Sequence, residues 1–172
     1  MPNSHWGWSV SKAPVRVQDT LLILISIFVA CMLTVVPLPE GVTEFRPEWL
    51  AMVAFYWAAF KPGSFGITAA WLCGLLLDIM DGTFLGMQAL SLATIGYVAL
   101  VMQHRLSMYP FSYQSVIVFL VVGIHLTAVH WLQGLFGVVS GGYSYLIPAL
   151  SSGLLWTLVA LLLMSLQHGL RR

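Results

Sequence analysis

Two carboxylates, Asp78 and Asp81, stand three residues apart in a sequence that carries very few charges. Of its 172 residues, 8% are charged and 59% are hydrophobic. A carboxylate at the end of an apolar helix faces the negative end of the helix dipole, which costs about 0.3–1 kcal/mol, so a compensating contact is expected. Water, Arg46, or the amides that open the next helix at Thr83 could supply it. Three roles for Asp78 stay open: a hydrated helix end, a structural contact within a hairpin, and an ion or substrate relay.

Two histidines, His125 and His130, lie inside an apolar segment. Five residues advance a helix by roughly 500°, so their rings lie about 140° apart and cannot easily bind one metal ion together. A neutral histidine hydrogen-bonded inside a bundle is the simpler explanation for each, and a proton carrier or ligand is the alternative. The sequence has no nucleophile with a base at usable spacing, no phosphate-binding loop and no HExxH motif. We therefore expect no catalysis, no cofactor and no metal site.

Six apolar segments supply the elements that would position these residues. They predict an all-α integral membrane protein with six transmembrane helices, forming a single membrane domain over residues 1–172. Four of the segments are long enough to cross ~30 Å of hydrocarbon, which takes about 17–25 residues. The two short ones, second and third in order, are expected to form a hairpin that turns at Lys61-Pro62-Gly63. The segments are 20–37, 48–60, 64–80, 84–102, 114–133 and 146–167.

The basic residues orient these helices. If six helices alternate across the membrane, six of the seven Lys and Arg residues share one side with Asp19, and Arg46 is the base on the other side. Basic loops stay cytoplasmic, so both termini are predicted to be inside. Net charge is +1, without a basic tract, which argues against nucleic acid as a partner. The six residues are Lys12, Arg16, Lys61, Arg105, Arg171 and Arg172.

Small residues form a stripe along the fourth segment. Their spacing of four, three, four and three places them on one face of a helix that starts with a GxxxG pair. Close backbone approach across small residues is what holds helices together in lipid. The stripe would serve either packing inside the bundle or docking of a partner's transmembrane helix, and both uses stay open. It consists of Gly82, Gly86, Ala89, Ala93 and Gly96.

The segment Arg46-Pro47-Glu48-Trp49 has the composition of a helix start at the membrane boundary. Proline suits the first helical position, glutamate suits the positive end of the helix dipole, and tryptophan suits the interface. This segment is followed by FYW at 55–57, KP at 61–62 and GLLLDIMDGTFLG at 74–86. In that order, and across nearly the whole chain, these motifs resemble the rod shape-determining protein MreD family. The resemblance places seven residues on family-typical positions, namely Arg46, Pro47, Trp49, Gly74, Asp78, Gly82 and Gly86.

The resemblance implies a non-enzymatic, multi-pass scaffold of the bacterial inner membrane that acts in cell elongation. Its partner would chiefly be MreC, a bitopic membrane protein, in an assembly with MreB, RodA and penicillin-binding protein 2. This assembly maintains cell shape and lateral peptidoglycan synthesis. The fold is also similar to the six-helix substrate-binding subunits of vitamin-uptake transporters. An importer subunit is therefore the alternative function, and it would need polar groups that converge near the midplane, for which Asp78, Ser91, Thr94 and His125 are scattered candidates.

Reporter fusions test the predicted orientation. A reporter that is active only outside the cytoplasm is expected to be active after Gly41 and after Gly82, and inactive after Lys61. The reason is that Lys61 belongs to the basic, cytoplasmic side. An external signal after Lys61 would contradict the predicted topology.

Overall fold

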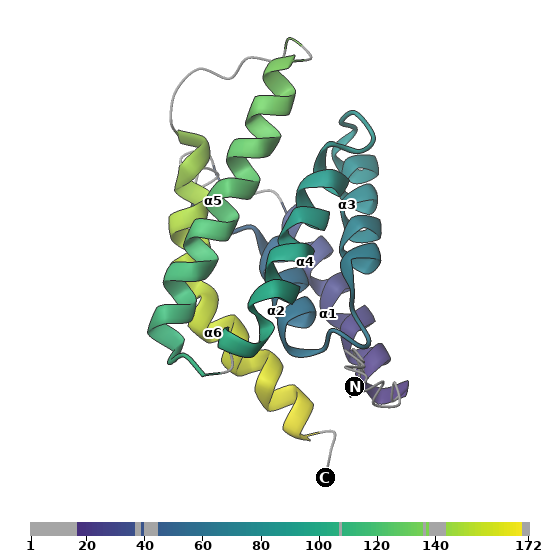
Figure 1. Ribbon diagram of the computed structural model, residues 1–172. Coiled ribbons are helices and arrows are strands. Elements are labelled where there is room, and N and C mark those ends of the chain that lie inside the picture. The colour runs from purple at the N-terminus through teal and green to yellow at the C-terminus, as the bar shows by residue number, and fades with distance from the viewer. Residues whose placement is uncertain are drawn as a thin grey trace, which may run out of the picture.

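A computed structural model describes residues 17–36, 39, 45–106, 108–135, 137 and 144–169, and within these ranges the chain is helical, without strands. The helices form one bundle in which α5 and α6 lie side by side and α3 and α4 form a second close pair (Figure 1). The elements in these ranges are α1 (Val17–Val35), α2 (Trp49–Phe60), α3 (Ile67–Asp81), α4 (Met87–Leu106), α5 (Phe111–Leu135), the short 3-10 helix η2 (Ser144–Leu146) and α6 (Ile147–Gly169).

Helix α2 is the centre of the bundle and contacts α1, α3, α4, α5 and α6. Ten of its 12 residues, 50–59, are buried, and Trp57 is completely enclosed. A helix that is apolar on every side is suited to such a position. At 1.5 Å per residue α2 is about 18 Å long, shorter than the ~30 Å hydrocarbon core of a bilayer. Its short length and nearly complete burial make α2 the element around which the other helices pack.

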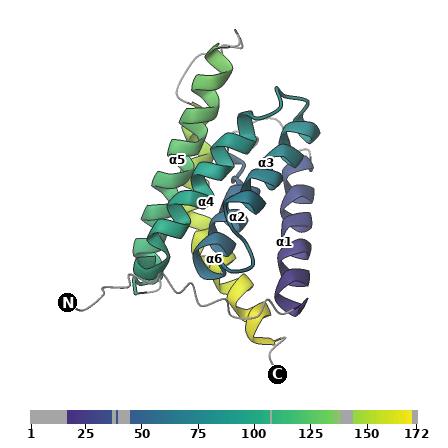
Figure 2. The same ribbon diagram turned by 45° about the vertical axis from the view of Figure 1, so that its right-hand side comes forward.

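The turn between α2 and α3 occurs at the predicted Lys61-Pro62-Gly63. The amide of Lys61 donates to Trp57 O at 2.8 Å, and its carbonyl accepts from the amides of Ser64 and Phe65. The ammonium of Lys61 also forms an ion pair with Asp19 at 2.9 Å, which joins this turn to the first turn of α1. The first turn of α1 and the last turn of α6 lie at the same end of the bundle, the lower end in Figures 1 and 2. Lys12, Arg16, Arg171 and Arg172, on which the predicted orientation also rests, lie outside the described residues.

Within the described residues, three helices are long and apolar enough to cross a membrane, whereas the sequence predicted four. The fourth segment was predicted at 84–102, but α4 begins three residues later and continues to Leu106. It therefore includes polar residues near its end, among them His104 and Arg105, which lower its mean hydropathy. Large apolar side chains are exposed on the outside of the bundle, such as Leu154 at 81%, and an apolar exterior of this kind is typical of a surface that contacts lipid or a protein partner. The three candidate spans are Gln18–Val35, Phe111–Leu135 and Ser144–Gly169.

Helices α3 and α4 pack through small residues. A Cβ atom added to Gly74 of α3 would lie 2.3 Å from the Cα of Ala89, and one added to Gly96 of α4 would lie 2.9 Å from the Cβ of Ala70. Ala89 and Gly96 are buried, and Ala93 is partly buried. Of the two uses left open for the small-residue stripe, packing inside the bundle is the one that Ala89 and Gly96 serve.

The predicted GxxxG start of that stripe is wrong. Gly82 is the residue that ends α3, with a φ of 63°, and Gly86, with a φ of 105°, precedes the first residue of α4. Both backbones lie in the left-handed region, which glycine adopts at little cost. These two glycines therefore shape the turn between the helices, and the helical part of the stripe begins at Ala89.

Replacing Gly74 by alanine should destabilise the protein. The new methyl group would overlap the backbone of Ala89, and overpacking of this kind costs about 1–3 kcal/mol of unfolding free energy, with more expected against backbone atoms. Thermal unfolding of the purified protein in detergent measures the effect. Gly134→Ala is the matched control, because no atom lies within 4 Å of a Cβ at that position of α5. Equal melting of the two variants would contradict the described packing of α3 on α4.

Candidate functional site

The carboxylate of Asp78 closes the junction between α3 and α4. Asp78 lies in the last turn of α3 and is 1% exposed. Its Oδ2 accepts the backbone N–H groups of Gly86 at 2.8 Å and Ala89 at 3.3 Å. Its Oδ1 accepts the backbone N–H of Gln88 at 2.9 Å and the hydroxyl of Thr83 at 3.2 Å. One buried carboxylate thus receives four hydrogen bonds.

These bonds make Asp78 a cap for α4 that is supplied by the preceding helix. The amides at the start of a helix have no partner within the helix, and the positive end of the helix dipole favours a negative charge there. The sequence predicted that the amides opening the next helix at Thr83 could compensate the charge of Asp78. The amides that bind the carboxylate belong instead to Gly86, Gln88 and Ala89. The predicted opening of this helix at Thr83 is wrong, because Asp81 still belongs to α3 and α4 begins only at Met87. Of the three roles left open for Asp78, the geometry supports the structural contact.

Gly74 lies one turn before Asp78 on α3 and allows this contact. Residues four apart share a face of a helix, so Gly74 and Asp78 both face the first turn of α4. Because Gly74 has no side chain, the backbone of Ala89 reaches the surface of α3, where its amide meets the carboxylate. Gly74 and Asp78 therefore act together in one helix junction.

The segment before α2 joins three helices. The guanidinium of Arg46 donates to the carbonyl of Leu33 at 2.9 Å, in the last turn of α1, where a cation is favoured by the helix dipole. The amide of Glu48 donates to the hydroxyl of Ser152, a fully buried residue of α6, at 2.9 Å. Helix α2 begins at Trp49, as predicted for a helix start here. Pro47, however, precedes the helix instead of occupying its first position, because its carbonyl accepts the Trp49 amide in a tight turn at 2.9 Å.

The two histidines have separate structural partners. His125 is buried between α4 and α5, where its Nδ1 lies 2.6 Å from the hydroxyl of Ser91, and that hydroxyl donates to the carbonyl of His125 at 3.2 Å. His130 stacks on the ring of Tyr145, with centroids 4.3 Å apart and planes at 6°. Among the described residues, no group of three or more His, Cys, Asp and Glu side chains could hold a metal ion. His125 thus has the internal hydrogen bond that the simpler explanation requires.

Sequence reasoning missed Gln114, a second buried capping residue. Its side-chain amide donates to the carbonyls of Leu106 and Tyr109, both at 3.0 Å, and so binds the end of α4. Its Oε1 accepts the indole N–H of Trp156 on α6 at 3.3 Å. The available signal was a polar residue at the start of the apolar segment 114–133. Gln114 thus binds the end of α4, as Asp78 binds its start.

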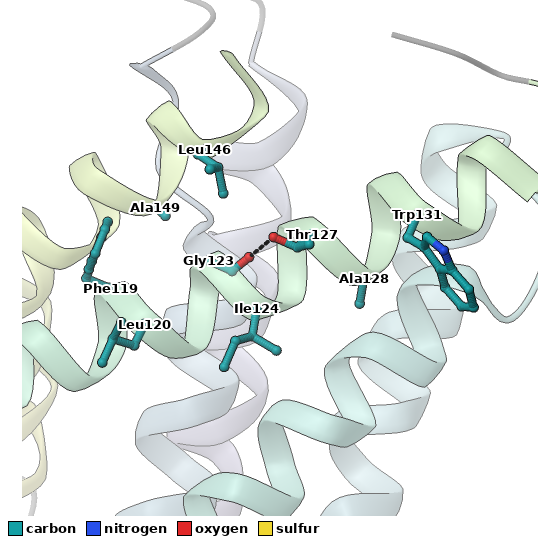
Figure 3. Close-up of a pocket in the computed structure, with 9 residues that line it drawn as sticks. All are labelled: Phe119, Leu120, Gly123, Ile124, Thr127, Ala128, Trp131, Leu146 and Ala149. Atoms are coloured by element: carbon teal, nitrogen blue, oxygen red, sulfur yellow. Dashed lines mark hydrogen bonds between the residues drawn. The ribbon is translucent and has the colours of Figure 1, made fainter. Parts of the chain in front are cut away.

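Two apolar grooves open on the outside of the bundle. The α5 groove has a volume of about 520 Å³ and lies along α5 beside η2 and the start of α6 (Figure 3). Its lining includes Gly123, whose carbonyl accepts the hydroxyl of Thr127 at 2.8 Å, as Figure 3 shows. The lining residues are Phe119, Leu120, Gly123, Ile124, Thr127, Ala128, Trp131, Leu146 and Ala149.

The second groove, the α1–α6 groove, has a volume of about 350 Å³. Its two walls are α1 and α6, and its floor is α2. Wall residues from α1 are Leu22, Ile25, Ser26, Val29, Ala30 and Leu33; wall residues from α6 are Leu155, Leu158, Val159, Leu162, Leu163 and Leu166; floor residues are Trp49, Val53 and Trp57.

Replacing Asp78 by asparagine should weaken the helix junction. The neutral amide keeps one acceptor oxygen, so buried N–H donors lose their partner, at a cost of about 1–3 kcal/mol of unfolding free energy. Hydrogen exchange should accelerate at the amides of Gly86, Gln88 and Ala89, and mass spectrometry in detergent measures it. Asp81→Asn, at an exposed position three residues away, should leave both the exchange and the melting temperature near wild type. Unchanged exchange at those three amides in the Asp78 variant would contradict the capping role.

Comparisons with known proteins identify the family of this chain. The family model for the rod shape-determining protein MreD matches residues 15–166. A rod shape-determining protein MreD from Haemophilus influenzae is 30% identical over 149 residues, which cover 86% of this chain and 92% of that protein. No solved structure matches the chain. The predicted resemblance is confirmed, and the chain belongs to the MreD family of rod shape-determining proteins.

Proposed function

We propose that this protein is a non-enzymatic scaffold of the bacterial inner membrane that binds the transmembrane helix of MreC. In this role it would support the assembly of MreB, RodA and penicillin-binding protein 2 and so sustain lateral peptidoglycan synthesis. Membership of the MreD family indicates a role in rod shape determination. Two observations support MreC as the partner. The buried polar side chains form hydrogen bonds inside the bundle, and the outer surface of the bundle is apolar.

The observation that carries the proposal is that the buried polar side chains bond within the bundle. Asp78 binds the start of α4, Gln114 binds its end, and Ser91 pairs with His125. Ser152 binds the segment before α2. An importer subunit would need such groups to converge on a cavity of ligand size, whereas the cavity that Ser91, Thr94 and His125 line holds only about 30 Å³. Their use in helix junctions favours a scaffold that offers apolar surface to its partners.

The α5 groove is the surface that best suits a partner helix. The sequence left open a partner on the small-residue stripe of α4, but Ala89 and Gly96 of that stripe are buried, against residues of α3. The α5 groove has Gly123, Ala128 and Ala149 in its lining, and small residues allow two helix backbones to approach closely in lipid. A transmembrane helix of MreC would pack there along α5.

We also propose that all six helices lie in the membrane as one multi-pass domain with both termini in the cytoplasm. The ion pair between Lys61 and Asp19 supports the placement of those two residues on one side. Because α2 is enclosed by other helices, its short length does not expose backbone ends to lipid. The proposed architecture is also similar to that of the six-helix substrate-binding subunits of vitamin-uptake transporters.

Replacing Gly123 by leucine should release MreC. A Cβ at this position would lie 3.9 Å from Ala149, an ordinary contact, so the bundle should still fold while the longer side chain fills the α5 groove. We expect at least about tenfold less MreC to purify with the variant, which corresponds to about 1.4 kcal/mol. The same variant should fail to restore rod shape to cells depleted of the wild-type protein.

Gly134→Leu is the matched control for this variant, since it makes the same substitution in the same helix outside the α5 groove. It should retain MreC and restore rods. Normal MreC binding and normal rods with Gly123→Leu would refute the docking site. Normal rods and normal lateral wall synthesis after depletion of the protein itself would refute the scaffold role.

A further inference from the structure

A small cavity with polar lining residues, the α4–α5 cavity, lies between α4 and α5. It has a volume of about 30 Å³, and the polar residues that line it are Ser91, Thr94 and His125. Ile124 and Ala128 line both this cavity and the α5 groove, so the two adjoin each other (Figure 3). Ser91 and His125 are buried, whereas Thr94 is exposed. Polar side chains thus lie directly behind the apolar surface that we assign to a partner helix.

The polar atoms of this cavity are arranged as hydrogen-bond acceptors. The Ser91 hydroxyl donates to the carbonyl of His125 at 3.2 Å, so Nδ1 of His125 is the donor in the 2.6 Å contact with the Ser91 oxygen. In a neutral imidazole the other nitrogen, Nε2, is then an acceptor. The Thr94 hydroxyl donates to the carbonyl of Leu90 at 3.0 Å, and its oxygen keeps lone pairs that can accept. A group that donates an N–H or O–H would therefore suit both residues.

The size of the cavity limits what this donor can be. Within the part of the chain that the structure describes, Nε2 of His125 has no hydrogen bond. A buried water needs at least about 10–15 Å³, so the cavity has room for one or two groups of that size. A hydroxyl or a carboxamide at the end of a side chain meets this limit and supplies the donor.

We propose that the α4–α5 cavity receives the end of one side chain of the docked partner helix, a hydroxyl or carboxamide that donates to Nε2 of His125. This inference rests on the scaffold function proposed above, in which the transmembrane helix of MreC lies along α5. The side chain passes Ala128 while the helix itself stays on the apolar lining of α5. Because lipid is as apolar as that lining, a hydrogen bond near the middle of α5 (Phe111–Leu135) selects the helix and its register.

Two variants of His125 separate recognition of the partner from the internal contact with Ser91. Asparagine places its amide where Nδ1 lies, so His125→Asn can keep the Ser91 contact but has no atom at the Nε2 position. Glutamine is longer and can place its amide near Nε2. We expect about threefold to tenfold less MreC to purify with His125→Asn, the range for one hydrogen bond between membrane helices, and His125→Gln to restore most of it. Melting in detergent checks that both variants are folded.

Thr94→Val tests the same cavity at an exposed position, so it does not depend on the tolerance of the core. It removes the second acceptor and should lower MreC retention by about twofold to threefold. Thr34→Val on α1 is the matched control, because the Thr34 hydroxyl likewise donates to a carbonyl four residues earlier, that of Ala30, at 2.8 Å. Thr34 lines neither the cavity nor the α5 groove, so this variant should retain MreC like wild type.

A double-variant experiment identifies the side chain of the partner. Each residue of the MreC transmembrane helix that carries a side-chain O–H or N–H is replaced in turn by alanine. Retention of each MreC variant is measured with the wild-type protein and with His125→Asn. At one position the loss seen with the wild type should be absent with His125→Asn, because the hydrogen bond is already missing there.

Full retention of MreC by folded His125→Asn and Thr94→Val would overturn the proposal. Losses that simply add at every position of the MreC helix would overturn it as well. If the wild-type protein retains no MreC, the scaffold function fails and this inference fails with it. If Gly123→Leu releases MreC but His125→Asn and Thr94→Val do not, this inference alone is wrong.

Discussion

The carboxylate of Asp78 holds the first turn of α4 against the last turn of α3, and the arrangement of the bundle depends on this contact. Backbone groups without partners are costly in a hydrocarbon environment, so the start of a buried helix must find acceptors in the protein. Asp78 supplies them from the neighbouring helix, and Gly74 makes the necessary approach possible. With its start bound by Asp78 and its end bound by Gln114, α4 is fixed in length and position. It can then present Ser91 to His125 and Gly96 to Ala70.

The fixed α4 completes a shell around α2. Helix α2 contributes apolar side chains in every direction, and its own start is bound through Glu48 to Ser152 of α6. The few buried polar side chains thus lie where helices begin, end or contact each other. What the bundle offers outward is apolar surface with two grooves of different character. One has small residues in its lining and suits a helix, and the other lies between α1 and α6 over α2.

The importance of Asp78, the turn at Lys61-Pro62-Gly63 and a helix start within residues 46–49 could all be predicted from local residue types. The start of α4 could not, because glycine at 82 and 86 is equally compatible with a helical small-residue stripe and with a left-handed turn. The actual choice follows from Asp78, which binds amides eight to eleven residues away. The roles of Gln114 and Ser152 depend on partners in other helices, which spacing along the chain does not reveal. The burial of α2 on all sides was likewise hidden, because a short apolar segment is compatible with a core helix and with half of a membrane hairpin.

The polar groups hold the bundle together, and we propose that partner binding takes place on the apolar surface of α5. Photo-crosslinking in living cells tests it most directly, with a benzophenone amino acid placed at single exposed positions around the bundle. We expect crosslinks to MreC from Leu120 and Thr127, which line the α5 groove, and none from Leu90 of α4 or Leu154 of α6. Crosslinks to MreC concentrated at Leu90 or Leu154, with none from the α5 groove, would contradict it.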